Sequence, residues 1–97
     1  MVINVENIQE TIKTIKPNAK PNTIKQYEAL LTRLKKIFDS KDYDFLNKPK
    51  DVENKLDGKA YTSVRNTYNA IIVLLNALNS ENKYDDLIKE YGDMRDV

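Results

Sequence analysis

The chain has 97 residues, which is enough for one domain and too short for two. Hydrophobic residues make up 40% and charged residues 32%, as in ordinary globular proteins, and two glycines are too few for the many tight turns of a β-sandwich or barrel. The sequence has no cysteine and no histidine, which excludes a disulfide framework, a zinc–thiolate site and the commonest general base. Composition therefore predicts no catalytic residues, no metal ligands and no cofactor.

Targeting and membrane-spanning segments are also missing from the sequence. The first residues have neither a basic flank nor a long apolar run, so they do not form a signal peptide. The longest apolar run, Ala70 to Leu75, is far shorter than the ~20 residues of a membrane span. We therefore expect no membrane association and an intracellular location, either the cytoplasm or the nucleus of a host.

Apolar residues recur at helical spacing from the start of the chain. The first stripe predicts a short helix that Pro17 ends, and it comprises Val5, Ile8, Ile12 and Ile15. The stretch from Pro17 to Asn22 reads as a loop, with Asn22 as the N-cap of the next helix. That second helix is expected from about Thr23 to Phe38, with an apolar stripe of Ile24, Tyr27, Leu31, Leu34 and Phe38.

The second half of the chain continues the helical pattern. Residues 39–48 read as a loop anchored by a few apolar side chains, and a short helix follows Pro49 and stops at Gly58. A fourth helix is expected to begin near Thr62 or Ser63, either of which could cap it, and Asn79-Ser80 interrupts it. This helix is the most apolar and should be the most buried, through Val64, Tyr68, Ile71, Ile72, Leu75 and Leu78.

The last segment predicts a fifth helix, with Tyr84, Leu87, Ile88 and Tyr91 at helical spacing and Gly92 as its stop. The fold class is therefore all-α, a single bundle of about four to five helices over residues 1–97. Its core is expected at about residues 20–79. Residues 81–97 are expected to form a C-terminal helix that docks on the body, or a linker to a further domain.

Acidic residues give no convincing metal or catalytic pattern. Asp42, Asp44 and Glu53 fall at positions 1, 3 and 12 of a calcium-loop register, but Leu46 and Asn47 stand where that loop needs an oxygen ligand and a glycine. The carboxylates at the end of the chain have no nucleophile beside them, and they read as a solvated surface: Asp85, Asp86 and Glu90.

The charge of the chain is unevenly distributed although the net charge is only +1. Residues 11–36 carry seven basic side chains and a single acidic one, Glu28, whereas residues 81–97 are acidic overall. A basic run of this kind is by itself more typical of a solvated helical surface than of a nucleic-acid footprint. Among the aromatic residues, which could stack on bases, Tyr61 has the best prospect of being exposed, while Tyr27, Phe38, Tyr68 and Tyr91 lie on apolar stripes.

Two segments resemble a known family in both motif and order. Residues 23–34 read Thr23-Ile-Lys-Gln-Tyr27-Glu-Ala-Leu-Leu31-Thr-Arg-Leu34, similar to the first helix motif of the core-binding domain of tyrosine recombinases, the phage-integrase family. Residues 59–71 resemble that domain's later helix, which a hydroxyl residue and an aliphatic residue open, here Ser63 and Val64. The resemblance covers about residues 20–79. It departs from the family at Lys20, where a serine is usual, and at residues 79–83.

The resemblance implies a SAM-like helical domain that forms one half of a clamp around duplex DNA in a viral or mobile-element integrase. In that family the catalytic residues lie in a separate C-terminal domain of the same protein. That domain and duplex DNA are the implied partners. This chain lacks histidine, so we expect it to bind DNA without cutting or joining it.

The expected DNA-contacting residues lie at the starts of the second and fourth helices, where free amides and basic side chains coincide. Arg65 and Asn66 are of the types that read guanine and adenine edges. The full set is Lys20, Asn22, Thr23, Lys25, Gln26, Lys59, Thr62, Ser63, Arg65 and Asn66.

A second class of function remains open from the sequence. The chain could instead be a small helical module that binds another protein, or a second copy of itself, through an apolar groove. The two hypotheses differ in whether Lys25, Lys59 and Arg65 lie on one concave polar surface or diverge around an apolar one.

Overall fold

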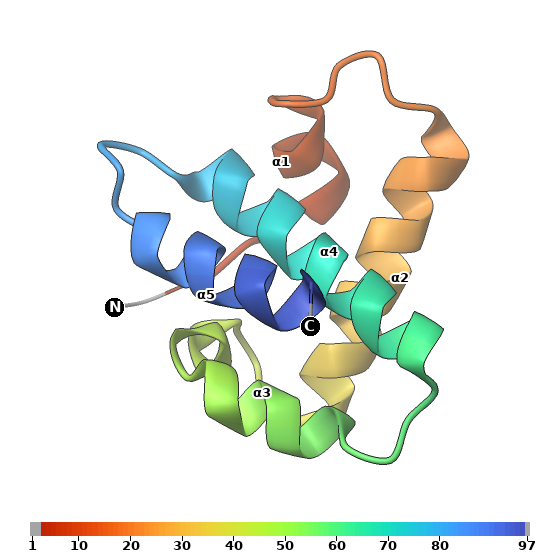
Figure 1. Cartoon of the computed structure of the whole chain (residues 1–97). Coiled ribbons are helices and arrows are strands. Elements are labelled where there is room, and N and C mark those ends of the chain that lie inside the picture. Colours follow the sequence, from red (N-terminus) through yellow and green to blue (C-terminus); the bar gives the residue numbers. More distant parts are fainter. Residues whose placement is uncertain (1–2, 97) are drawn as a thin grey trace.

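Helix α4 (Tyr61–Leu78) lies at the centre of the molecule, with three of the other helices packed against it (Figure 1). The computed structural model describes residues 3–96, and these residues form five α-helices, one 3-10 turn and no strand. The predicted all-α bundle of four to five helices is therefore confirmed. The remaining elements are α1 (Ile8–Lys13), α2 (Pro21–Ile37), η1 (Asp44–Asn47), α3 (Pro49–Leu56) and α5 (Asp85–Asp96).

The segment of α4 from Ala70 to Leu75 is apolar around its whole circumference, and the polar Asn76 that follows it is exposed. Six consecutive residues, Ala70–Leu75, are buried, which is possible only because other helices cover every side of this segment. Helix α5 packs along α4 most extensively, and α2 and α1 cover other sides. The prediction that this is the most buried helix is confirmed.

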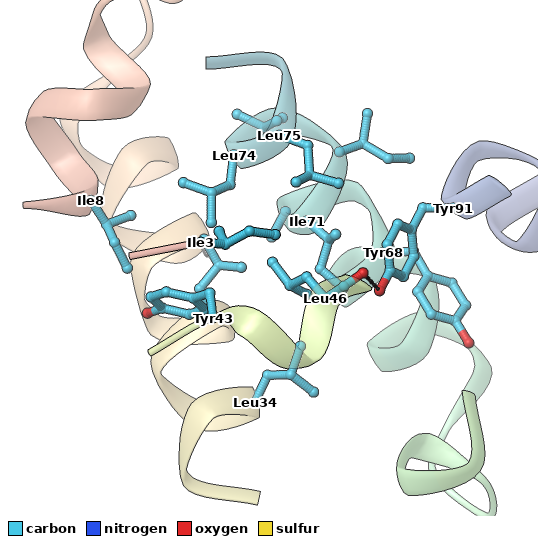
Figure 2. Packing of buried hydrophobic residues seen from close by; sticks show 14 of the residues in the cluster. Ile3, Ile8, Leu34, Tyr43, Leu46, Tyr68, Ile71, Leu74, Leu75 and Tyr91 are labelled. Carbon is cyan, nitrogen blue, oxygen red and sulfur yellow. Dashed lines mark hydrogen bonds between the residues drawn. The ribbon is translucent and has the colours of Figure 1, made fainter. Parts of the chain in front are cut away.

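A single hydrophobic cluster joins all the helices (Figure 2). Leu31 and Leu34 of α2 and Ile71 and Leu75 of α4 are buried, as expected, whereas Tyr27 is only partly buried. The cluster extends beyond residues 20–79 on both sides, through buried Ile3, Ile8 and Ile12 and through buried Tyr84 and Tyr91.

The starts of the helices differ from the prediction by one or two residues. Helix α2 begins at Pro21 with Lys20 as its N-cap, so Asn22 is inside the helix and caps nothing. Proline suits this first position because its fixed φ angle is helical and its missing N–H would have no partner there. Helix α4 begins at Tyr61 after Ala60, and neither Thr62 nor Ser63 caps it.

The first helix is also shorter than its apolar stripe. Asn7 caps α1 by accepting a hydrogen bond from the Glu10 amide at 3.1 Å, and the helix ends at Lys13. Ile15, the last residue of the expected stripe, is therefore outside the helix and 42% exposed.

The two glycines behave differently from each other. Gly58 follows α3 with φ +83°, a left-handed conformation that favours glycine, so its predicted role as a helix stop is confirmed. Gly92 was also expected to end a helix, and that prediction is wrong because α5 continues to Asp96. The last turn of α5 is held by tertiary contacts, since Met94 packs against the core and Arg95 Nη1 donates to Asn69 Oδ1 at 3.0 Å.

Helix α5 docks on the body as expected. Tyr91 is fully buried, its ring centroid lies 6.2 Å from that of Tyr68, and its hydroxyl donates to the Leu46 carbonyl at 2.8 Å (Figure 2). The turn before α5 is fixed by Asn79, which ends α4 and whose Oδ1 accepts from the Tyr84 amide at 2.7 Å. The body and the C-terminal helix therefore share one core.

Candidate nucleic-acid interface

Helices α2 and α4 form a groove between their polar faces. From α2 it is lined by Thr23, Gln26, Tyr27, Ala29, Leu30 and Arg33, and from α4 by Asn66 and Asn69. The volume of this groove is about 350 Å³. Side-chain amides and one guanidinium therefore line an open channel between two helices, with partly buried apolar side chains at its floor.

A second groove adjoins the first where α3 ends and α4 begins. Arg33 lines both, and here it faces Lys59, Ser63 and the buried Thr67. The floor of this second groove, about 260 Å³, is apolar: Leu30, Leu34, Ile37 and Leu56. The Thr67 hydroxyl donates a hydrogen bond to the Ser63 carbonyl of the same helix at 2.8 Å. Its proton is therefore not available for a hydrogen bond to a ligand in the groove.

A third groove lies between α4 and the end of α5. Thr62, Arg65, Asn66 and Asn69 line it from α4, and Arg95 and Asp96 line it from α5. Arg95 is held in place here, because it donates to Asn69 and its Nε lies 3.1 Å from Asp96 Oδ1. We call the surface of these three adjoining grooves the α2–α4 face.

Three of the four cations on the α2–α4 face have no partner among the described residues, and Arg95 is the exception. Among residues 3–96, the side chains of Arg33, Lys59 and Arg65 make no ion pair, hydrogen bond or cation–π contact. By contrast, Lys35 lies over the Tyr43 ring, Lys55 over Phe38 and Lys83 over Tyr84, while Arg95 pairs with Asp96. Unpaired cations with exposed side chains are the ones available to an anionic ligand.

The structure brings together seven of the ten residues predicted from the sequence. The α2–α4 face contains Thr23, Gln26, Lys59, Thr62, Ser63, Arg65 and Asn66. Lys25 lies on the other flank of α2, in a shallow groove with Glu28, Thr32, Arg33 and Lys36. The Glu28 carboxylate there accepts a hydrogen bond from Gln9 at 3.0 Å and makes this flank less positive.

The remaining two residues, Lys20 and Asn22, are exposed at the start of α2 and line none of the three grooves. The reason lies in how the helices cross. The start of α4 lies against the second half of α2, at Leu30, Arg33 and Ile37, and not against its start. The two helix N-termini, which the sequence suggested as one surface, are therefore separated along α2.

Three cationic or amide side chains of the face were not predicted as contacts. Arg33 lies seven residues after Gln26 and so shares its side of α2, and Asn69 follows Asn66 by three residues on α4. Helical spacing could have identified both. Arg95 comes from a different helix, and only the packing of α5 on α4 brings it to Asn69.

The acidic residues form no metal-binding group in the part of the chain that the structure describes. No group of three or more potential ligands there could hold a metal ion. Asp42 and Asp44 instead order the loop before η1, because Asp42 Oδ1 accepts from the Asp44 amide at 3.1 Å and Asp44 Oδ1 accepts from the Ile3 amide. Burial raises the pKa of Tyr43, Tyr68 and Tyr91, all of which lie in the core.

No helix within residues 3–96 is long and apolar enough to cross a bilayer. A scan against protein-family models found no match, and searches of the curated proteins and of the solved structures found none either.

Proposed function

We propose that this chain binds duplex DNA through the α2–α4 face and serves as the core-binding domain of a tyrosine recombinase or integrase. The observation that carries the proposal is the position of Arg33, Lys59 and Arg65. These cations come from α2, from the α3–α4 connection and from α4, they lie on adjoining grooves, and they have no partner among the described residues.

The chemistry of the face suits a duplex. Arg33 and Lys59 flank one groove, where they can neutralise phosphates and release counterions. Gln26 and Asn66 carry amides, and Arg65 carries a planar guanidinium, which are the groups that pair with adenine and guanine edges in the major groove. The face thus combines groups that position a duplex with groups that read it.

The low net charge of +1 does not oppose this function, because the charge is segregated. The outer surface of α5 carries exposed Asp85, Asp86 and Glu90, away from the grooves that α2 and α4 share. A domain of this kind binds DNA without cofactor or metal. Strand cutting and joining would belong to the catalytic domain of the same protein.

Fluorescence anisotropy with a generic labelled duplex tests the proposal. Binding should be measurable at about 50 mM salt and fall steeply towards about 200 mM. Lys59→Ala should weaken binding to every sequence and lower the log–log salt slope by about 0.9, the value for one phosphate contact. The matched control is Lys89→Ala on the exposed surface of α5, which should leave both quantities unchanged.

The second candidate is a protein-binding module, and the apolar floor of the groove at the start of α4 favours it. Leu30 and Ile37 remain partly exposed there beside Leu34 and Leu56. This function predicts self-association or capture of an amphipathic helix, with no DNA binding at low salt. Sedimentation velocity alongside the anisotropy titration separates the two candidates.

A further inference from the structure

We propose that Tyr61, with Arg65 and Lys59 on either side, forms a stacking site for an unpaired base of DNA at the edge of the α2–α4 face. The proposal rests on the proposed function, because the duplex-binding face would deliver the single strand. It goes further in assigning a second ligand, a single-stranded end or gap next to the duplex.

The exposure of Tyr61 is the first observation. Its side chain is 65% exposed, whereas every other aromatic residue in the described part of the chain is buried or partly buried. Most of those residues also have a ring partner, as in the stacked pair of Phe38 and Phe45, whose centroids lie 4.2 Å apart. Tyr61 has no such partner among residues 3–96 and offers a free ring to solvent.

The position of Tyr61 in α4 explains this exposure. It is the first residue of the helix. The residues of α4 that pack into the core, such as Tyr68 and Ile71, come later in the helix. Tyr61 contributes nothing to the hydrophobic cluster. Core packing therefore does not account for an aromatic residue at this position.

The charged residues next to Tyr61 in the sequence indicate the class of ligand that the site would bind. Arg65 follows it by four residues and so shares its side of the helix, and Lys59 precedes it by two residues. Both cations are exposed and unpaired, and no acidic residue occurs between Lys59 and Asn66. Proteins that hold single-stranded nucleic acid stack a base on an aromatic ring and contact the phosphate backbone with cations beside that ring. Such sites have little sequence preference.

The face beside Tyr61 extends the site towards a duplex. Arg65, one helical turn after Tyr61, also lines the groove that contains Thr62, Asn66 and Asn69. Asn66 and Asn69 line the amide-lined channel between α2 and α4 as well. A base-paired segment on the channel would place its next, unpaired nucleotide near Tyr61. The preferred ligand is therefore a duplex with a single-stranded overhang.

A tryptophan in place of Tyr61 gives a direct test, because the chain contains no other tryptophan. Emission of Tyr61→Trp should be quenched by a duplex with a short overhang more strongly than by the same duplex with blunt ends. The matched control is Ile15→Trp, at the other large hydrophobic residue that is exposed among residues 3–96, and it should respond equally weakly to both DNAs. Equal quenching of Tyr61→Trp by the two DNAs would overturn the proposal.

Affinity measurements complete the test. Tyr61→Ala should weaken binding of the overhang duplex by about tenfold, within the range for one stacked base, and Tyr61→Phe should retain it. Binding of the blunt duplex should not change in either variant. If blunt duplex binds but the overhang adds nothing, this inference fails and the proposed function stands. If neither DNA binds, both fail. If only the overhang DNA binds, the proposed duplex function fails, and with it the delivery of the strand by the duplex-binding face on which this inference rests.

Discussion

The two halves of α4 have opposite surroundings although they belong to one continuous helix. From Ala70 to Leu75 every residue is buried, whereas between Tyr61 and Asn69 only Thr67 and Tyr68 are. The buried half packs against α1, α2 and α5, and the other half presents hydroxyl, amide and guanidinium groups to the grooves.

This difference separates stability from binding along one element. Substitutions in the buried half should change the free energy of unfolding, and substitutions of exposed residues in the first half should leave it nearly unchanged, because surface changes away from special features usually have small effects.

The largest effect is expected from Ile71→Ala. Ile71 is fully buried in α4, so the change removes apolar contacts and leaves a cavity, at a cost of about 2–5 kcal/mol. Urea denaturation followed by circular dichroism measures this loss. Arg65→Ala in the exposed half is the matched control, and a cost below ~1 kcal/mol for Ile71→Ala would show that the two halves do not differ as described.

The next effect concerns the contact between α5 and the body. Tyr91→Phe keeps the ring against Tyr68 but leaves the buried Leu46 carbonyl without its hydrogen bond, at a cost of about 1–3 kcal/mol. The same denaturation experiment measures it. Tyr61→Phe removes a hydroxyl from an exposed ring and should cost almost nothing, so equal costs for the two variants would contradict the docking of α5.

The Tyr91 hydroxyl also predicts how stability depends on pH. Burial raises the pKa of Tyr91 well above its ordinary value of 10.0, with a smaller contribution from Glu90. A group whose folded pKa is raised stabilises the fold below its unfolded pKa and loses that contribution as pH rises. Unfolding free energy should therefore fall above about pH 10, and less steeply in Tyr91→Phe. Parallel pH profiles for the two proteins would contradict this prediction.

The smallest effects come from the two glycines, and they should have opposite signs. Gly92 lies inside α5, and a Cβ there meets no atom within 4 Å, so Gly92→Ala should stabilise the fold by about 0.5–1 kcal/mol. Gly58 also has open space but φ +83°, so Gly58→Ala should destabilise by about 1–2 kcal/mol. Melting temperatures measure both, and a destabilising Gly92→Ala would indicate that α5 ends near Gly92.

The apolar pattern predicted the helices well because burial dominates their stability. The stripes through Leu31 and Ile71 follow from spacing alone, whereas for the segment that contains Tyr91 the spacing left a docked helix and a linker both open. Helix starts were less predictable. Asn22, Thr62 and Ser63 are good caps by residue type, but α2 begins at Pro21 and α4 begins at Tyr61, before these residues. The prediction that Gly92 ends α5 is wrong for a different reason, because contacts of Met94 and Arg95 stabilise the helical turn that follows it.

The candidate site was harder to anticipate than the fold. Residue type and helical spacing identified Arg65, Asn66 and Gln26, which do line the grooves. The sequence could not show that α4 begins beside the second half of α2. This crossing places Arg33 at the centre of the face and leaves Lys20 outside it. Relative placement of helices depends on packing between distant segments, which local patterns do not encode.

The most direct test of the central claim reverses charge at the α2–α4 face without touching the core. The double variant Arg33→Glu and Arg65→Glu changes two exposed cations that have no partner among the described residues. We predict a melting temperature close to that of the parent and loss of duplex binding at about 50 mM salt, where phosphate contacts contribute strongly. A folded double variant that binds duplex DNA as tightly as the parent would contradict the claim.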